Sequence, residues 1–481
     1  MLQVPYFCGL FQGYLQADEL PQCATINEMT HPISPLDGRY ADRLQAHQAY
    51  FSEFALMRAR CEIEVRYLLA LDEARYFEPL TEEEKRRIYD LIANFSDADY
   101  AAIKDIESRT RHDVKACEMF LRSRLQLAQP NLIHFALTSE DVNNLSYSIL
   151  LRDYLTNVQL PQLASLLQQL CTLAEQWAEI PFPTRTHGQK ATPSTAGKEI
   201  AVFINRLSRY YAQLRDFRFS GKFNGAVGNF SAMLAALPQV DWLAFSQDFI
   251  QSLQLDFNPC TTQIEDHDRF ADYFNLTRQI NNIVADLNVD CWLYISRDLF
   301  SERSQAGEVG SSTMPHKVNP INFENSEGNI AIANSLLAMM SDKLTRSRMQ
   351  RDLSDSTVQR NIGVALAHSF LALSETLRGL QKLQINPHNC LSKLQNSPEL
   401  LAEPIQTILK LAGIDDPYEL LKKHTRGQKT TRENLLQLVD SLPELPTHLR
   451  QQIHALQPEN YIGDAVRICQ LVVKNARTML S

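Results

Sequence analysis

Glycine is scarce in this chain of 481 residues, and the way it is distributed carries information. There are 16 glycines, with none between Gly38 and Gly188 and none between Gly228 and Gly307. Because glycine and proline interrupt helices, the long glycine-free stretches rich in Leu, Ala, Glu, Gln and Arg favour α-helix. No alternating pattern typical of strands and no repeat of fixed period is present. The sequence therefore predicts an all-α protein.

Three further absences limit the class of protein. The nine cysteines are odd in number and never form Cys-x-x-Cys, which favours reduced thiols in a cytoplasmic protein over disulfides or a zinc site. The net charge of −9 lacks the basic excess of a general nucleic-acid surface, so local lysines and arginines must hold any anionic ligand. No apolar run of about 18 residues would span a membrane. We expect neither a nucleic acid nor a membrane as partner.

What the sequence does contain is a succession of long helical patterns. We predict helices over 41–74, 82–94, 98–127, 140–178, 195–219, 266–303, 321–344 and 357–384. Residues 1–28 lack the basic start of a signal peptide and form an N-terminal extension of unknown role. An N-terminal helical domain over 29–126, a central domain of long helices over 127–384 and a small C-terminal helical domain over 385–481 follow. Long helices favour a bundle, and exposed apolar faces on it would favour self-association.

The stretch from Ser304 to Asn329 interrupts these helical patterns. It holds three glycines, two prolines, four serines, a histidine and a lysine, and little of it could fill a core. Polar loops between rigid helices often carry function, so we predict a loop that presents Ser311, Ser312 and Lys317. Asn319 would be the N-cap of the next helix. A linker without function is the alternative, and the absence of Gly-x-Ser-x-Gly disfavours a hydrolase.

Histidines mark two further candidate segments. Prolines surround His187 and Gly188 lies beside it, so we expect an extended connector with room for a ligand. An imidazole there can serve as a general acid or base near neutral pH, although a structural role is the alternative. The following helix would have Thr192 as its N-cap. His112 lies inside a helical pattern, where a lone histidine is more often structural.

Polar groups at helix starts could bind an anion, although capping alone would also explain them. Arg39 and Tyr40 lie in a turn-rich entry to the first helix. Thr138 and Ser139 precede a helix whose free N–H groups can be capped or can attract a carboxylate. Ser356 could cap a helix among several arginines, which would suit a phosphate unless these arginines are only solvated.

The glycine-rich segment 221–229 resembles a phosphate-binding loop only in part. It lacks the Gly-Lys-Ser/Thr ending of a P-loop, and no strand is predicted before it. We interpret it as a connection between helices.

Together these segments resemble the fumarase/aspartase lyase superfamily. Residues 310–319 match its shared motif Gly-Ser-x-x-Met-x-x-Lys-x-Asn at every fixed position. Within the superfamily, the sequences of 34–40, 112–113, 138–141 and 186–189 are similar to those of the adenylosuccinate lyase family. Fumarases and argininosuccinate lyases typically have Thr-His-Leu-Gln where this chain has Gly188. The resemblance covers about 30–481, and its departures are the N-terminal extension and Lys190, where proline would be more usual.

The resemblance implies three all-α domains and a homotetramer built on a central helix bundle, with active sites shared by several subunits. It implies β-elimination of fumarate from adenylosuccinate, giving AMP, and from the succinylo-carboxamide ribotide SAICAR, giving AICAR, in purine biosynthesis. No cofactor or metal is expected. The alternatives are another fumarate-releasing lyase, such as an argininosuccinate lyase, and a non-catalytic helical scaffold.

Matching positions also carry over the roles of individual residues. Ser311 would be the base that removes the β-proton of the succinyl group, and His187 the acid that protonates the departing nitrogen. The expected contacts to succinyl carboxylates are Lys317, Asn319, Thr138, Ser139 and Ser312. Arg39, Tyr40, Arg351, Ser356 and Arg360 resemble contacts to phosphate and ribose. Other expected substrate contacts are Arg111, His112, Asp113, Gln263, Val318, Asn325, Thr357, Val358 and Gln359. Because the pKa of a serine hydroxyl lies far above 7, such a base needs a positive and water-poor site.

Overall fold

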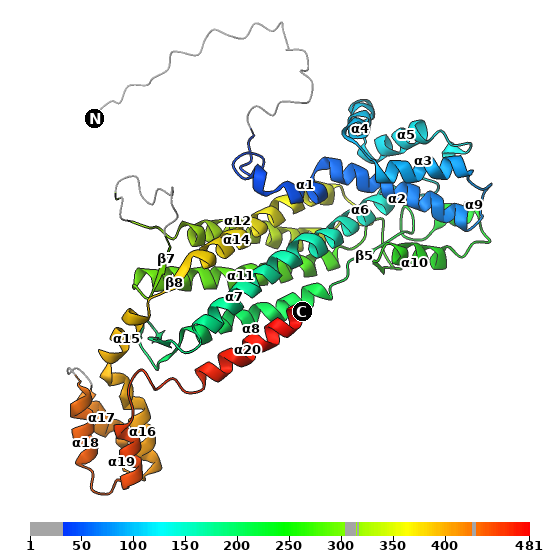
Figure 1. The fold of residues 1–481 in the computed structure, drawn as a ribbon. Coiled ribbons are helices and arrows are strands. Elements are labelled where there is room, and N and C mark those ends of the chain that lie inside the picture. Colours follow the sequence, from blue (N-terminus) through cyan, green and yellow to red (C-terminus); the bar gives the residue numbers. More distant parts are fainter. Residues whose placement is uncertain (1–31, 304–313, 315–316, 426–429) are drawn as a thin grey trace, which may run out of the picture. The chain divides into compact units, whose positions relative to one another are not determined.

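The computed structural model describes residues 32–303, 314, 317–425 and 430–481 (Figure 1). The chain separates into two compact units, of which the first ends at Leu44 and the second spans Gln45–Ser481. The described part of the first unit consists of turns and the 3-10 helix η1, Ala41–Arg43. The Tyr40 amide donates to the Pro35 carbonyl over 2.9 Å, and the Arg43 guanidinium lies over the Tyr40 ring at 5.8 Å.

The second unit is predominantly helical, which confirms the all-α prediction. Its first helices are α1 Gln45–Phe51, α2 Glu53–Glu73, α3 Glu82–Ala93, α4 Asp97–Thr110, α5 Asp113–Leu125, η2 Pro130–Leu132, α6 Ser139–Tyr154, the π-helical turn η3 Leu155–Gln159 and α7 Leu160–Gln176. There follow α8 Ala196–Arg215, α9 Ser231–Ala236, α10 Trp242–Ser252, α11 Asp268–Ser296, α12 Ile321–Leu344, α13 Ser354–Gln359 and α14 Ile362–Lys382. The last are α15 Pro387–Gln395, η4 Pro398–Leu401, α16 Ala402–Leu411, α17 Pro417–Thr425, α18 Arg432–Asp440, α19 Thr447–His454 and α20 Ala465–Leu480.

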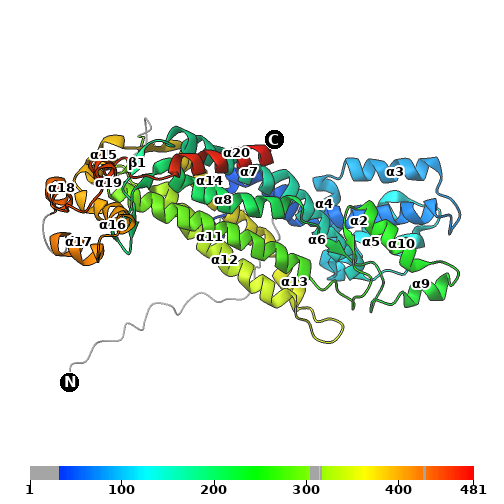
Figure 2. The ribbon, with the colours of Figure 1, turned by 90° about the horizontal axis from the view of Figure 1, so that it is seen from below.

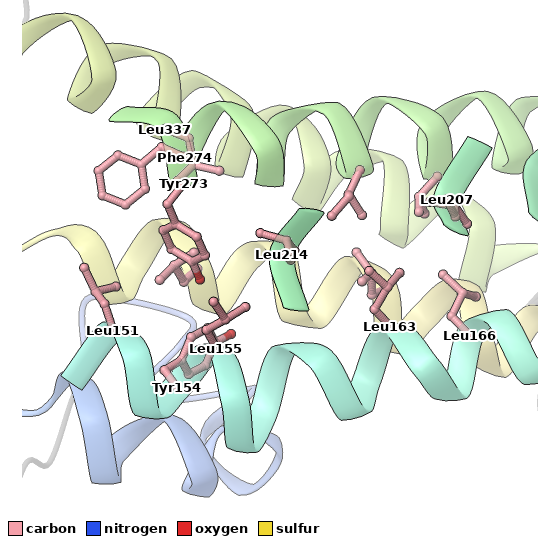
Figure 3. Packing of buried hydrophobic residues seen from close by; sticks show 14 of the residues in the cluster. Leu151, Tyr154, Leu155, Leu163, Leu166, Leu207, Leu214, Tyr273, Phe274 and Leu337 are labelled. Atoms are coloured by element: carbon pink, nitrogen blue, oxygen red, sulfur yellow. The ribbon is translucent and has the colours of Figure 1, made fainter. Parts of the chain in front are cut away.

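The long helices α7, α8, α11, α12 and α14 pack side by side around the largest apolar core (Figures 1 and 2). Leucines at helical spacing on α7, among them Leu163 and Leu166, are fully buried there against Leu207 and Leu214 of α8 and neighbouring residues (Figure 3). This spacing places one apolar stripe of α7 toward its neighbours. The C-terminal helix α20 packs on α7 and α8 and contributes to the same core.

Two smaller apolar clusters lie outside this bundle. One is formed by α2 to α5, and the other by helices from η4 to α19. The division of the chain into three domains stays a prediction, and these separate clusters are the reason to keep it. Among the described residues, no helix is long and apolar enough to cross a membrane.

Three predicted helices are divided in the structure: 41–74 into η1, α1 and α2, 98–127 into α4 and α5, and 357–384 into α13 and α14. The helix predicted over 98–127 is wrong, because α4 ends at Thr110 and α5 begins at Asp113. Arg111 between them has φ 54°, in the left-handed region that reverses the chain direction. Neither glycine nor proline marks this break, so no local signal in the sequence predicts it.

The eight very short strands among the described residues were also not predicted. Antiparallel pairs are β1 Pro181–Phe182 with β4 Ser194–Thr195, β2 Arg185–Thr186 with β3 Gln189–Lys190, and β7 Phe300–Glu302 with β8 Leu383–Ile385. The strand β5 Ser220–Gly221 pairs in parallel with β6 Asp256–Phe257. Strands of two or three residues are too short to produce an alternating sequence pattern.

Candidate functional site

A cavity of about 650 Å³ lies where α4, α5, α6 and α13 meet. Many of the predicted substrate contacts line it, although they are far apart in the sequence. From the predicted set, the lining contains Arg111, His112, Asp113, Ser139, Arg351, Ser356, Thr357, Gln359 and Arg360. The structure therefore brings together the segments around residues 112, 139 and 356.

An ion-pair network on Asp113 forms one wall of the cavity. Its Oδ2 atom lies 2.9 Å from an Arg60 nitrogen and 3.0 Å from an Arg360 nitrogen. Arg60 is only 3% exposed and also donates to Asn143 over 2.9 Å. Burial by itself would raise the pKa of Asp113, but Arg60, the Val114 amide and Arg360 together hold this pKa below its usual value. Asp113 therefore stays ionised and fixes two arginines.

The turn between α4 and α5 positions His112. His112 is the N-cap of α5, and its Nδ1 accepts a hydrogen bond from the Lys115 amide over 3.2 Å. A neutral imidazole that accepts at Nδ1 carries its proton on Nε2. His112 can therefore donate from Nε2 to a ligand in the cavity that it lines. A cap and a binding group are compatible roles for this side chain.

The N-terminus of α6 supplies a second wall. Thr138 is its N-cap, and the Thr138 amide donates to Asp141 over 2.9 Å, while Ser139 lines the cavity. Asp141 is fully buried and pairs with Lys222, also fully buried, over 2.8 Å. The segment 221–229 lies between α8 and α9, as predicted for a connection between helices. It begins with a strand residue of β5, and its lysine neutralises the carboxylate that caps α6.

Arg351 is held at the cavity wall by several side chains, among them Asp355, whose Oδ2 lies 3.9 Å from the Arg351 Nε. Its guanidinium lies 3.2 Å from Glu140 Oε2 and donates over 3.3 Å to both Gln263 Oε1 and Ser356 Oγ. Ser356 lies inside α13, which begins at Ser354, so its predicted capping role is wrong. The Ser356 hydroxyl instead contacts Arg351.

Glu140 was not predicted as a site residue. The pKa of Glu140 is raised to about 7, mainly because the carboxyl is buried; Arg351 and Lys222 act to lower this pKa, and Asp355 acts to raise it. Its sequence position, in the first turn of a helix, resembles that of an ordinary surface glutamate. Only its spatial neighbours reveal that it is buried beside an arginine.

His187 lies in a hairpin, where we predicted an extended connector. It occupies the two-residue turn between β2 and β3 with φ 51°, and Gly188 follows with φ 74°. Positive φ at both central positions is typical of a type I′ turn. The His187 side chain is exposed. The predicted N-cap at Thr192 is wrong, because α8 begins at Ala196 with Thr195 as its cap.

Two contacts attach this hairpin region to the C-terminal helices. Lys190 Nζ lies 2.8 Å from Glu399 Oε1 in η4, and the Thr192 hydroxyl donates to Glu403 of α16. The neighbouring strand β1 lies beside α15, at the end of the long helices opposite α4 and α5 (Figures 1 and 2). Within one chain, the His187 hairpin and the cavity are thus at opposite ends of the bundle.

Lys317, Val318 and Asn319 lie just before α12, which begins at Ile321 with Pro320 as its N-cap, so the predicted cap at Asn319 is wrong by one residue. The other end of α12 is near the cavity, since His267 lies beside the Leu344 carbonyl and contacts the cavity residue Gln359. Helix α12 has 24 residues, so its ends lie about 36 Å apart. Lys317 and Asn319 are therefore remote from the cavity of their own chain.

The remaining predicted residues fall into four groups. Ser311 and Ser312 lie outside the described residues. Arg39 and Tyr40 belong to the first unit, which is described by itself. Asn325 lies in α12 and accepts a hydrogen bond from Asn329 over 2.7 Å. Val358, in α13, is partly buried and is not among the residues that line the cavity.

Comparisons with known proteins agree with the motifs. A family model described as lyase matches residues 38–333, and one described as adenylosuccinate lyase C-terminal matches residues 347–462. The chain is 44% identical over 446 residues to the adenylosuccinate lyase of Haemophilus influenzae and 46% identical over 442 residues to that of Escherichia coli K12. These alignments cover 91% and 90% of this chain, and 98% and 97% of the two relatives.

Two solved structures share the fold at low sequence identity. A fumarate lyase from Mesorhizobium sp. BNC1 superimposes with a TM-score of 0.74 at 18% identity, covering 89% of this chain and 97% of that one. The 3-carboxy-cis,cis-muconate lactonizing enzyme from Pseudomonas putida gives a TM-score of 0.73 at 20% identity, covering 91% and 98%. Together with the relatives that match along nearly their whole length, these findings show that the chain belongs to the adenylosuccinate lyase family of the fumarase/aspartase superfamily.

Proposed function

We propose that the chain is an adenylosuccinate lyase, which eliminates fumarate from adenylosuccinate to give AMP and from SAICAR to give AICAR. As a member of this family it is an enzyme, a lyase that cleaves C–N bonds. The observation that carries the substrate assignment is the identity of 44% and 46% to adenylosuccinate lyases over about nine-tenths of the chain. We expect the enzyme to act in purine biosynthesis in the cytoplasm.

The cavity supports a nucleotide substrate. Four arginines, Arg60, Arg111, Arg351 and Arg360, line it together with only two carboxylates, those of Glu107 and Asp113. Arginine suits phosphate because its planar guanidinium presents several donors at once. The half-buried Ser139 and the imidazole of His112 add neutral donors. We assign the phosphate and ribose of the substrate to this cavity.

The elimination needs a base, an acid and a site for developing charge. We assign the removal of the β-proton to Ser311 and the protonation of the departing nitrogen to His187. Removing a proton beside a carboxylate builds a dianion, so cations and N–H groups around it lower the barrier when they bind the transition state more tightly than the substrate. Lys317 and Asn319, together with Thr138, Ser139 and Ser312, are the groups we assign to the succinyl carboxylates.

These assignments require more than one chain. Lys317 and Asn319 lie at one end of α12 and the cavity at the other, about 36 Å away for a helix of 24 residues. One nucleotide cannot bridge that distance. We therefore propose a homotetramer in which each active site takes the His187 hairpin and the cavity from different copies of the chain.

A spectrophotometric assay tests the proposed function. The purified protein should turn over adenylosuccinate and SAICAR, followed by the change in purine or imidazole absorbance as fumarate leaves. Argininosuccinate is the control substrate, and no turnover of it is expected. Activity with argininosuccinate alone would contradict the substrate assignment. Inactivity with all three succinyl compounds would favour a non-catalytic scaffold.

A further inference from the structure

Glu140 is a buried carboxylate directly behind the cavity. It is 1% exposed and follows Ser139, which lines the cavity, in the first turn of α6. Glu140 itself is not part of the lining. It cannot touch a ligand in the cavity, but its Oε2 atom lies 3.2 Å from the Arg351 guanidinium, which can.

The residues around Arg351 hold its side chain in a fixed orientation. Its side chain is 17% exposed, and the groups it contacts come from separate parts of the fold: Glu140 from α6, Asp355 and Ser356 from α13, and Gln263 from the segment before α11. Gln263 is itself fixed, since its side chain donates to the Ala226 carbonyl over 3.0 Å. An arginine held in this way loses little rotamer freedom when it binds an anion.

Fold stability does not explain why a carboxylate occupies this position. Glu140 Oε1 is buried and has no hydrogen-bond partner among the described residues, and Asp355 adds a second negative charge nearby. The groups that face Glu140 are Arg351, Asn143, Asp355 and, at longer range, Lys222. Burying a carboxylate that is only partly paired costs free energy. The benefit must therefore lie in what Glu140 does to Arg351.

We propose that Glu140 is a positioning residue whose carboxylate orients Arg351 at the cavity wall, so that its remaining donors face the anionic nucleotide part of the substrate. This inference rests on the proposed function, because it takes the cavity to bind a nucleotide. It predicts that a substitution of Glu140 affects ligand binding and folding stability differently. Binding of the nucleotide part should weaken, while the fold should lose no stability.

The central test is Glu140→Gln, which keeps the shape and removes the charge. We expect KM for adenylosuccinate and Kd for AMP, measured by calorimetry, to rise by about tenfold, as the loss of one charge-assisted contact would give. We expect kcat to change less and the unfolding midpoint at pH 8 to stay the same or rise. Glu140→Asp retains the charge and should recover part of the AMP affinity.

A matched control is Glu375→Gln. Glu375 is also buried and lies 3.3 Å from an arginine, Arg378, but it belongs to α14 and does not line the cavity. Its substitution should leave AMP affinity unchanged. In an Arg351→Ala background, Glu140→Gln should have no further effect on AMP affinity, because its target is gone.

The outcomes separate this inference from the function on which it depends. If wild type is active but Glu140→Gln leaves both KM and AMP affinity unchanged, the positioning role is wrong. A lowered unfolding midpoint with unchanged AMP affinity would show a purely structural role and would also overturn it. If the wild-type protein does not turn over adenylosuccinate, the proposed function itself is wrong.

Discussion

The two ends of the long helices in the second unit are built in contrasting ways. At the cavity end, Arg60 and Asp113 form an ion pair over 2.9 Å, and their side chains are only 3% and 18% exposed. At the other end, His187 stands exposed in a tight turn. The ion pair nearest to that turn joins Lys190 and Glu399, whose side chains are 48% and 38% exposed. The charged groups at the cavity end are thus held in place by contacts within a single chain. At the hairpin end, the His187 imidazole is exposed and available to a binding partner.

Because of this difference, substitutions at the two ends should affect folding stability and turnover to different degrees. A buried ion pair that loses one partner leaves an uncompensated charge and destabilises the fold strongly. An exposed pair contributes little, because water screens it. Removing the carboxylate of Asp113, which pairs with the buried Arg60, should therefore change both folding and binding. Substitutions at the hairpin end should change turnover alone.

The largest effect is expected at the hairpin. His187→Ala should reduce kcat by about 10²- to 10⁴-fold, the usual contribution of a general acid, and Ser311→Ala should be similarly inactive. The unfolding midpoint of His187→Ala should match wild type, because the side chain is exposed. Steady-state kinetics and thermal unfolding check this pair of outcomes. His448→Ala, at an exposed histidine of α19, is the control and should keep full turnover.

Asp113→Ala is the corresponding substitution at the cavity end. It leaves Arg60, 3% exposed, without its carboxylate, and we expect a loss of about 3–5 kcal/mol in the free energy of unfolding. Urea unfolding measures it, and AMP affinity should also fall. For comparison, Glu399→Ala should cost less than about 1 kcal/mol, because it breaks an exposed pair. Equal losses for the two variants would refute the contrast between the ends.

The folding stability should also depend on pH through a buried histidine near the cavity. Burial lowers the pKa of His267, which contacts the cavity residue Gln359, to about 4. The unfolded chain takes up this proton below about pH 6.5 but the folded chain only near pH 4, so stability is lost as the pH falls through this window. The loss from this residue should be about 2 kcal/mol at pH 5. His267→Gln should show a correspondingly smaller fall in urea-unfolding free energy between pH 7 and pH 5.

The smallest change in stability is expected for substitutions in the helix bundle between the two ends. Two glycines there form a matched pair. A Cβ at Gly197, where α8 approaches α7, would lie 2.6 Å from the Ala178 Cα, whereas a Cβ at Gly328 in α12 would meet nothing within 4 Å. Gly197→Ala should therefore destabilise by about 1–3 kcal/mol through overpacking. Gly328→Ala should stabilise by up to about 1 kcal/mol, from helix propensity. Thermal unfolding of both variants checks the difference, and destabilisation by both would contradict it.

Much of this architecture could be predicted from the sequence because helices follow from local patterns. The long glycine-free stretches gave the all-α class and most of the helices. The break at Arg111 was missed because a non-glycine residue adopts the left-handed conformation there. Predicted caps at Thr192, Asn319 and Ser356 failed because a serine, threonine or asparagine before a helical pattern does not by itself define where the helix begins.

The candidate site was predictable only where motifs identified it. Segments around His112, Ser139 and Arg351 do meet in one cavity. Arg60, Glu140 and Lys222 were missed, since a charged residue on a helix or in a loop looks like a surface residue until its neighbours are known. The distance between His187 and the cavity was not predicted either, because no local sequence pattern indicates that they lie at opposite ends of the same bundle.

Mixing two inactive variants tests the central claim, that one active site takes the hairpin from one copy of the chain and the cavity from another. His187→Ala and Arg351→Ala would be combined in equal amounts, dissociated and reassembled, and assayed with adenylosuccinate. Random assembly should leave about a quarter of the sites with both segments intact, so activity should return to roughly that fraction of wild type. A mixture as inactive as its two parents, despite verified exchange of subunits, would contradict the account.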